Sequence, residues 1–353
     1  MRILAINPGS TSTKIGVFHD DSLFMHNTIR HSPADLAHFP DAMAQFDYRL
    51  QLVIDTLKND LIPFDFDVIV GRGGLIKPVG GGVYEINNQL LKETENAMCR
   101  HACNLGSMIA ANLAKRLPNC IALMADPGVV DELDDIARIS GSPLMPRFTI
   151  WHALNQRAIA RRFAKEHGMR YEDLNLIACH LGGGISLAVH RNGRAVDANN
   201  ALTGEGPFSP ERSGTLPVGQ LIDLCYSGKY THKQMIEYVT RGSGLLAHLG
   251  TNDVATILER IKEGDKKAEL VLDAMIYQVA KSIGGLAPVL YGKVDAILLT
   301  GGIANSEYVT SRITERVAFI APIYVYAGED ELTALALNAL SAMRGEQKIK
   351  QYK

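Results

Sequence analysis

The feature that most constrains this chain is a weak internal repeat with a spacing of 173 residues. Residues 3–6 match residues 176–179 as apolar strand patterns, and the small-residue stretch 7–11 matches residues 180–184. In each half the strand pattern runs into a Gly, Ser or Thr turn and a second strand pattern follows. Two buried strands of any α/β protein can look alike, so a chance match is the alternative. Self-similarity at a fixed spacing indicates a repeated unit, and we expect a duplicated domain whose two hairpin turns face each other across a cleft.

Short strand patterns alternate with longer helical patterns along the chain, which is typical of the α/β class. Strands are expected at residues 2–7, 14–18, 23–29, 66–70, 120–124, 174–179, 186–190, 194–199, 295–300 and 323–326. Helices are expected at 41–62, 88–117, 153–167, 217–228, 231–240, 252–263, 266–290 and 330–344. A length of 353 residues predicts about two domains. The polar tail, 346–353, is expected to be frayed.

The charge balance disfavours some classes of partner. The chain has 36 Lys plus Arg against 38 Asp plus Glu, a formal net charge of −2, and no long block of like charges. That balance argues against nucleic acid or an anionic membrane as the main partner. The 5 cysteines are scattered without zinc spacing, which predicts reduced thiols in a cytoplasmic protein. We identify no signal peptide and no apolar run long enough to span a membrane.

The first candidate site is the turn between the first two strand patterns. It runs from Asn7 through Ser10 and Ser12 to Lys14, and it offers hydroxyls, backbone N–H groups and one cation. Such a turn can cradle phosphate oxygens. It is not a Walker A loop, because the G-x-x-x-x-G-K-[ST] pattern occurs nowhere in the chain. The alternative is a plain hairpin turn rich in Ser and Thr.

Two further glycine-rich turns follow strand patterns. His180 is followed closely by three glycines, 182–184, whose backbone can approach a ligand and donate N–H groups. The stretch 300–306 follows a buried strand and opens a helix, where adenine or ribose can be bound. Each turn is a weak signal alone and could be only a flexible loop.

Four single residues lie beside such turns: Arg72, Asp126, His152 and Arg212. Ligand sites of α/β sheets collect at the carboxyl ends of strands, and arginine there binds carboxylate or phosphate bidentately. The alternatives are a surface salt bridge for each arginine and a helix-start histidine for His152. Taken together, two arginines, an aspartate and a histidine beside glycine turns favour a functional site.

These motifs together resemble the acetate and butyrate kinase family of the actin, Hsp70 and sugar-kinase superfamily. The resemblance extends from Asn7 to residues 329–332 and includes Gly71-Arg72-Gly73-Gly74 and Pro210-Glu211-Arg212-Ser213-Gly214. It implies two ribonuclease-H-like (actin-like ATPase) domains with mixed sheets and a nucleotide cleft between them. The first would comprise residues 1–150 plus the C-terminal helix, 330–353, and the second residues 151–329.

The resemblance also implies roles for individual residues. The expected catalytic residues are Arg72, Asp126, His152 and Arg212, with His101 a looser match to a functional histidine. ATP or ADP would be held by Asn7, Ser10, Ser12, Lys14, His180, Gly182, Gly183, Gly184, Gly301, Gly302, Ile303 and Asn305. Mg²⁺ would be served by Asn7, Asp126 and Glu331, where Glu329 and Asp330 are alternatives to Glu331.

The implied reaction is reversible transfer of the γ-phosphoryl group of ATP to a short-chain carboxylate in a cytoplasmic homo-oligomer, a dimer or a multiple of dimers. The chain departs from acetate kinases at Trp151 to Gln156 and at Gly183, where those enzymes carry Phe-His-Gly-Thr-Ser-His and Asn. These departures disfavour acetate and leave straight four- and five-carbon acids, branched acids and propionate open. A sugar kinase needs a carboxylate base, and Asn7 stands where that superfamily branch carries Asp. A non-catalytic nucleotide-binding protein is the remaining alternative.

Overall fold

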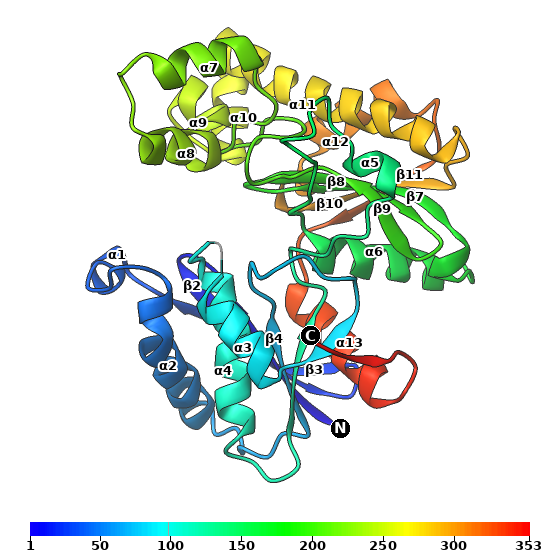
Figure 1. The fold of residues 1–353 in the computed structure, drawn as a ribbon. Coiled ribbons are helices and arrows are strands. Elements are labelled where there is room, and N and C mark those ends of the chain that lie inside the picture. Colours follow the sequence, from blue (N-terminus) through cyan, green and yellow to red (C-terminus); the bar gives the residue numbers. More distant parts are fainter. Residues whose placement is uncertain (98) are drawn as a thin grey trace. The chain divides into compact units, whose positions relative to one another are not determined.

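Strands β1 (Arg2–Pro8) and β7 (Asn175–Leu181) start 173 residues apart and have the same length. Each pairs antiparallel with the next strand, β2 (Ser12–His19) or β8 (Ile185–Arg191). These elements belong to a computed structural model that describes residues 1–97 and 99–353 (Figure 1). The predicted repeat is confirmed in its strands, because both copies form the same hairpin at the same spacing.

The chain forms two compact units, Met1–Val130 with Asp330–Lys353 and Asp131–Glu329. The sheet of the first unit has the order β12-β5-β6-β4-β1-β2-β3. Besides β1 and β2 it contains β3 (Ser22–Arg30), β4 (Val68–Arg72), β5 (Val83–Glu85), β6 (Ile121–Ala125) and β12 (Ile349–Gln351). The residues from Ile3 to Ile6 are all fully buried, as expected for a strand covered on both faces.

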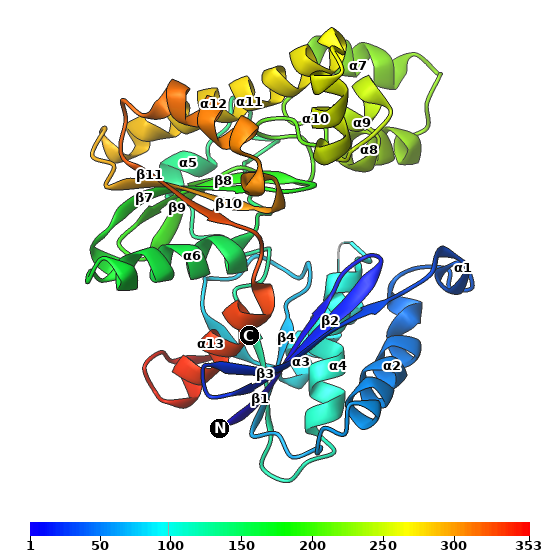
Figure 2. The same cartoon turned by 180° about the vertical axis from the view of Figure 1, so that it is seen from behind.

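Helices cover both faces of this first sheet, α4 on one side and α13 on the other (Figures 1 and 2). The helices are α1 (Pro33–Leu36), α2 (Phe46–Asn59), α3 (Asn88–Glu95), α4 (Leu105–Ala114) and α13 (Glu331–Met343), with short turns η1 (Met43–Gln45) and η2 (Ala102–Asn104). The single helix expected over 88–117 is wrong. A new helical segment begins after His101. The His101 ring accepts a hydrogen bond from the N–H of Cys103 (3.2 Å) and so caps η2.

The C-terminal tail is ordered, which corrects the expectation of a frayed end. Strand β12 pairs parallel with β5, and the Lys350 ammonium donates a hydrogen bond to the carbonyl of Gly81. Asn87 Nδ2 donates to the carbonyl of Tyr352 (2.9 Å), whose ring is buried. Strand β12 is too short for its pattern to be recognised in the sequence.

The sheet of the second unit has the order β11-β10-β7-β8-β9. Its other strands are β9 (Arg194–Ala198), β10 (Ala296–Gly301) and β11 (Ile323–Ala327). Strand for strand, this repeats β6-β4-β1-β2-β3 of the first unit, with the same parallel and antiparallel pairs. The chain is therefore an α/β protein built from two mixed sheets with a common core topology.

Alternate side chains of β7 enter different cores of the second unit. Ile177 and Cys179 pack with α11 (Lys266–Leu286) and α12 (Glu307–Val317), whereas Leu176 and Ala178 pack with α6 (Ala153–Glu166). By length and composition alone, the segment Lys266–Leu290 could cross a membrane. Its residues Leu272, Met275 and Val279 are fully buried in this core, and 33% of its most apolar stretch is buried inside the structure.

The remaining helices of the second unit lie mainly before α11. They are α5 (Asp135–Arg138), α7 (Val218–Tyr226), α8 (His232–Arg241), α9 (Gly244–Leu249) and α10 (Val254–Lys262), with turns η3 (Tyr171–Asp173), η4 (Ala287–Leu290) and η5 (Gly302–Asn305). Helices α7 to α10 form a group beside one end of α11 (Figures 1 and 2).

The two units divide earlier than the expected boundary at residue 150. The segment after Val130 packs within the second unit: the N–H of Asp134 donates to the carbonyl of Val196 (2.9 Å), and Arg147 forms an ion pair with Glu205 (2.5 Å). The return of Asp330–Lys353 to the first unit agrees with the expected division at residue 330. The cleft between the units stays a prediction.

Candidate functional site

The first hairpin turn lies at the end of β1. Asn7 pairs with Lys14 across the hairpin, and the N–H of Gly9 donates to the carbonyl of Ser12 (2.7 Å) to close the turn. Ser10 is exposed and Ser12 is half-buried. The four residues that the sequence singled out here, Asn7, Ser10, Ser12 and Lys14, therefore share one turn of the first unit.

Three predicted site residues from distant parts of the chain meet in the first unit. Glu331 is the first residue of α13, and its Oε2 accepts hydrogen bonds from Asn7 Nδ2 (2.5 Å) and Arg72 Nη1 (2.6 Å). Arg72, at the end of β4, also donates to Asn7 Oδ1 (3.2 Å). The carboxylate is buried, and the guanidinium compensates its charge. The cluster brings an amide and a cation, from the ends of the parallel strands β1 and β4, to a carboxylate at the start of α13.

Asp126 follows β6 in the same unit and has a constrained backbone. Its φ of 37° lies in the left-handed region, which few non-glycine residues adopt, although aspartate does so more often than most. Its N–H donates to the carbonyl of Gly82 (3.0 Å), and its Oδ1 accepts from the N–H of Gly82 (2.7 Å). Strain of this kind, held by reciprocal hydrogen bonds, is often found at functional positions.

Two histidine rings stack in the second unit. The rings of His152 and His180 lie 3.7 Å apart between centroids, with an angle of 8° between their planes. His180, near the end of β7, contacts Asn155 Oδ1 through Nδ1 (2.8 Å) and Glu329 Oε1 through Nε2 (3.0 Å). Each ring nitrogen of His180 therefore faces an oxygen atom.

Hydrogen bonds fix the protonated nitrogen of His152. Gln156 Nε2 donates to the carbonyl of Ser186 (3.0 Å) and to Ser186 Oγ (2.8 Å), and the N–H of His152 also donates to Ser186 Oγ (3.2 Å). The Ser186 hydroxyl has accepted twice, so its own proton is left for His152 Nδ1 (2.8 Å). His152 therefore accepts at Nδ1 and carries its proton at Nε2, which makes Nε2 a hydrogen-bond donor.

Arg212 is half-buried beside the glycine turn of the second unit. Its Nη1 donates to the carbonyl of Ala201 (2.9 Å), and burial lowers its pKa from the usual value. Gly184 lies so close that a Cβ there would overlap the guanidinium. The hydroxyl of Ser209 links the two segments, because it donates to the carbonyl of Gly183 (2.6 Å) and accepts from the N–H of Arg212 (3.1 Å). The glycine turn and the arginine thus form one rigid substructure.

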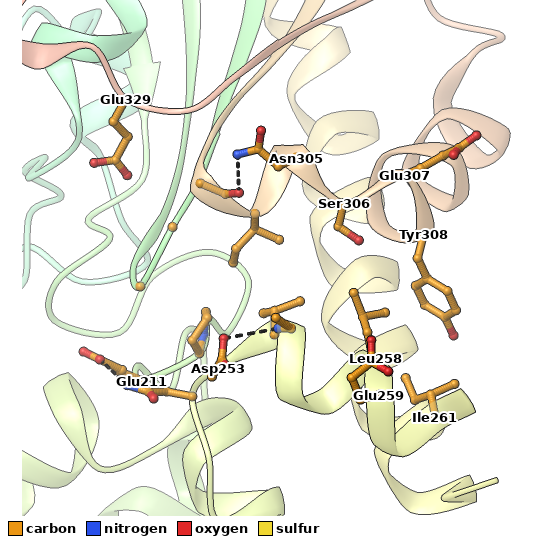
Figure 3. Close-up of a pocket in the computed structure, with 18 of the residues that line it drawn as sticks. Glu211, Asp253, Leu258, Glu259, Ile261, Asn305, Ser306, Glu307, Tyr308 and Glu329 are labelled. Carbon is orange, nitrogen blue, oxygen red and sulfur yellow. Dashed lines mark hydrogen bonds between the residues drawn. The ribbon is translucent and has the colours of Figure 1, made fainter. Parts of the chain in front are cut away.

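A pocket of about 1050 Å³ opens in the second unit (Figure 3). Figure 3 shows Asn305 and Ser306 on one side and Asp253, Leu258 and Ile261 on the other. Five of the residues predicted to bind nucleotide line it: Gly182, Gly183, Gly302, Ile303 and Asn305. Gly301, next to Gly302 in the chain, has a φ of 92°, and a Cβ there would overlap the backbone of Leu181. The volume of this pocket suits a nucleoside-sized ligand.

Sequence reasoning missed Ser186, Gln156, Asn155 and the contact of Glu329 with His180. The repeat held a signal for two of these features. The counterpart of Asn7 under the 173-residue shift is His180, and both contact a glutamate, Glu331 or Glu329. The counterpart of Thr13 is Ser186, and both hydroxyls contact a histidine ring, His31 (2.9 Å) or His152. Gln156 and Asn155 give no signal of this kind.

Known proteins resemble this chain in sequence and in structure. Residues 147–326 match the Acetokinase family. A protein from Bacteroides thetaiotaomicron described as "Probable butyrate kinase" is 61% identical over 353 residues, covering 100% of both chains. "Butyrate kinase 1" of Clostridium acetobutylicum is 48% identical over 354 residues, covering 100% of this chain and 99% of the relative. The crystal structure of Porphyromonas gingivalis acetate kinase, at 18% identity, shares the fold with a TM-score of 0.78 over 97% of this chain and 99% of that one.

Proposed function

Because this chain belongs to the acetokinase family, we propose that it is a butyrate kinase, which reversibly transfers the γ-phosphoryl group of ATP to butyrate and forms butanoyl phosphate and ADP. The observation that carries the proposal is the full-length identity of 61% to a relative described as a probable butyrate kinase. The fold and the clustered polar residues of both units agree with it. We further propose a cytoplasmic homo-oligomer, a dimer or a multiple of dimers.

Each unit, taken by itself, offers groups suited to the nucleotide. In the first unit, Ser10, Ser12 and Lys14 offer hydroxyls and a cation to phosphate oxygens. In the second, the turn from Gly182 to Gly184 offers backbone N–H groups, with His180 beside it. The pocket lined by Gly302, Ile303 and Asn305 receives the adenosine. Support for this assignment comes from the pocket, which joins two glycine turns that are far apart in the sequence.

The first unit carries oxygen donors of the kind that a magnesium ion prefers. Asn7, Asp126 and Glu331 offer amide and carboxylate oxygens, the ligands that Mg²⁺ prefers. Among the described residues, no group of three His, Cys, Asp or Glu side chains could hold a metal unaided. That agrees with Mg²⁺ in kinases, which relies on one or two carboxylates, waters and substrate phosphates. When bound, the ion neutralises charge on the phosphates.

The carboxylate nucleophile needs no general base, because a short fatty acid is already ionised at neutral pH. The reaction instead needs relief from the repulsion between two anions. Arg72 and Arg212 supply cations for the carboxylate and the phosphoryl group, and the Nε2–H of His152 donates to a phosphoryl oxygen as its charge grows. In this scheme Asp126 orients its neighbours and abstracts no proton.

A hydrophobic pocket for the acyl chain can set the choice of acid only weakly, since one methylene is worth about 1–3 kcal/mol of discrimination. Branched four- and five-carbon acids, propionate and acetate are therefore alternative substrates of the same site. A non-catalytic nucleotide-binding protein is the alternative from a different class.

A hydroxamate assay tests the proposal. The protein is incubated with ATP, Mg²⁺, hydroxylamine and one acid at a time, and trapped acyl phosphate is measured. Strong signal with butyrate and little with acetate is the expected result. Isobutyrate or isovalerate as the best acceptor would assign a branched-chain acid kinase, and acetate or propionate the corresponding kinase. No product with any acid, in protein that binds ATP, would contradict the acyl kinase and favour the binding protein.

A further inference from the structure

An arginine that the scheme above does not use lies fully buried beneath the first hairpin turn. Arg49, on α2, is the largest fully buried side chain among the described residues. Its Nη1 donates to the carbonyls of Gly9 (2.7 Å) and Ser12 (3.3 Å), and its Nη2 donates to the carbonyl of Ser10 (3.2 Å). One guanidinium thus binds three carbonyls of a single turn.

These hydrogen bonds decide which backbone groups the turn can offer to a ligand. The carbonyl of Thr11, the remaining residue of the turn, accepts from the N–H of His31 (2.9 Å). All four carbonyls from Gly9 to Ser12 are therefore bound by the protein. Carbonyl oxygens repel phosphate, whereas N–H groups and hydroxyls attract it. A turn with its carbonyls held inward is suited to an anion.

The rest of the Arg49 environment is neutral. Gln45 Oε1 accepts from Nε (3.0 Å) and Nη2 (2.8 Å), and Thr13 Oγ1 accepts from Nη1 (3.1 Å). Within residues 1–97 and 99–353, no carboxylate forms an ion pair with Arg49. Nearby Asp35 is exposed and accepts a hydrogen bond from Ser32 (2.7 Å).

The group stays charged in this setting. Burial lowers the pKa of Arg49 to about 10, which leaves the guanidinium protonated at neutral pH. Burial, together with the Arg49 charge, lowers the pKa of His31 to about 4, so the neighbouring ring is neutral. A buried positive charge without a counter-ion is costly unless an anion compensates it.

We propose that Arg49 is a positioning residue for nucleotide polyphosphate: it holds the carbonyls of the Gly9–Ser12 turn inward and supplies the buried positive charge that the phosphates neutralise. This inference rests on the proposed function, in which that turn binds the phosphates of ATP. Arg49 acts from behind the turn and needs no contact with the ligand. The alternative is that Arg49 is only a structural cross-link, whose loss would lower the stability of the whole first unit.

Calorimetric titration of the full chain with Mg²⁺-ADP and with adenosine distinguishes the positioning role of Arg49 from a purely structural one. Arg49→Met should weaken ADP binding about tenfold or more, a loss of about 1.4 kcal/mol or more, while adenosine affinity changes less than twofold, because only ADP carries phosphates. Arg49→Lys keeps the charge but lacks the planar fork, so it should bind ADP with intermediate affinity. The control is Arg344→Met, which removes an exposed arginine of the same unit and should change neither affinity.

Two results would overturn the role of Arg49. One is unchanged ADP affinity in Arg49→Met, and the other is an equal loss for ADP and adenosine, which indicates general loosening. Should Arg49→Met fail to fold, the same comparison is decided on Arg49→Lys. A failure of the proposed function looks different, because wild-type protein would then form no acyl phosphate in the hydroxamate assay, whatever the ADP affinities of the Arg49 variants.

Discussion

Two fully buried serines of this chain have opposite hydrogen-bonding environments. Ser186 Oγ accepts from Gln156 and from the N–H of His152 and donates to the His152 ring. Ser107 Oγ, on α4, has no hydrogen-bond partner within the described part of the chain. A buried hydroxyl without a partner costs about 1–3 kcal/mol, whereas a saturated one fixes the groups around it. The two residues therefore form a matched pair for mutation.

Ser186→Ala should lower kcat about 10- to 100-fold, because the His152 ring loses the donor that keeps its proton on Nε2. The KM values for ATP and butyrate should change little, since the ring donates mainly as charge grows in the transition state. Ser107→Ala should keep wild-type kinetics and raise the melting temperature. Steady-state kinetics and thermal denaturation of both variants provide the measurement. Equal kcat in Ser186→Ala and wild type would refute the positioning of His152 by this hydroxyl.

The buried ring of His31 predicts a stability that depends on pH. Burial and the Arg49 charge lower its pKa from 6.5 to about 4, whereas Asp35 raises it slightly. The ring also contacts Tyr48, at 5.6 Å between centroids. Between pH 6.5 and 4 the unfolded chain binds a proton that the folded chain does not, so stability falls as pH falls through this window.

The loss over that window is about 2 kcal/mol after allowance for solvent screening. The difference in melting temperature between pH 7 and pH 5 measures the part of this loss that falls above pH 5. His31→Gln should reduce that difference, and the exposed His26→Gln on β3 should leave it unchanged. An identical difference in wild type and His31→Gln would show that other groups cause the acid sensitivity.

Among the elements, the contact between β4 and α4 controls the position of Arg72. Gly71 and Gly106 meet there so closely that a Cβ on Gly71 would overlap the backbone of Gly106, and one on Gly106 would overlap the backbone of Arg72. Neither obstacle is a movable side chain. Helix α4 can therefore pack this closely against the end of β4, which carries Arg72, only because residue 106 is glycine.

Gly106→Ala should lower the free energy of unfolding by about 2–3 kcal/mol and reduce activity, because the strand and the helix must move apart. The control is Gly219→Ala on α7, where no atom lies within 4 Å of the added Cβ. Alanine there should stabilise the helix by up to about 1 kcal/mol. Melting temperatures of the two variants should therefore change in opposite directions; a stable Gly106→Ala would contradict this packing.

On the scale of the whole molecule, the sequence predicted what depends on local pattern and failed where distant segments meet. The strands of both sheet cores lie close to their predicted ranges, because buried strands produce apolar runs. Strand β12 and the role of Arg49 gave no such pattern, since each depends on a partner far away in the chain. The same holds for Glu331, whose choice over its neighbours rested on resemblance and whose contacts with Asn7 and Arg72 only the structure provides.

The first unit is assembled from both ends of the chain, and residues 329–331 lie where the chain returns to it. These residues include the proposed magnesium ligand, Glu331, and its two acidic neighbours, so mutation of each one tests the assignment. Glu331→Gln should raise the Mg²⁺ concentration for half-maximal rate about tenfold or more, because the cluster loses its carboxylate charge. Removal of Mg²⁺ with EDTA should abolish activity in every variant. Asp330→Asn preserves the hydrogen bond to the N–H of Thr333 that begins α13, so its Mg²⁺ requirement should stay normal. Glu329→Gln should alter the His180 contact without changing that requirement. A raised Mg²⁺ requirement in Asp330→Asn or Glu329→Gln, with Glu331→Gln normal, would move the metal ligand to that residue.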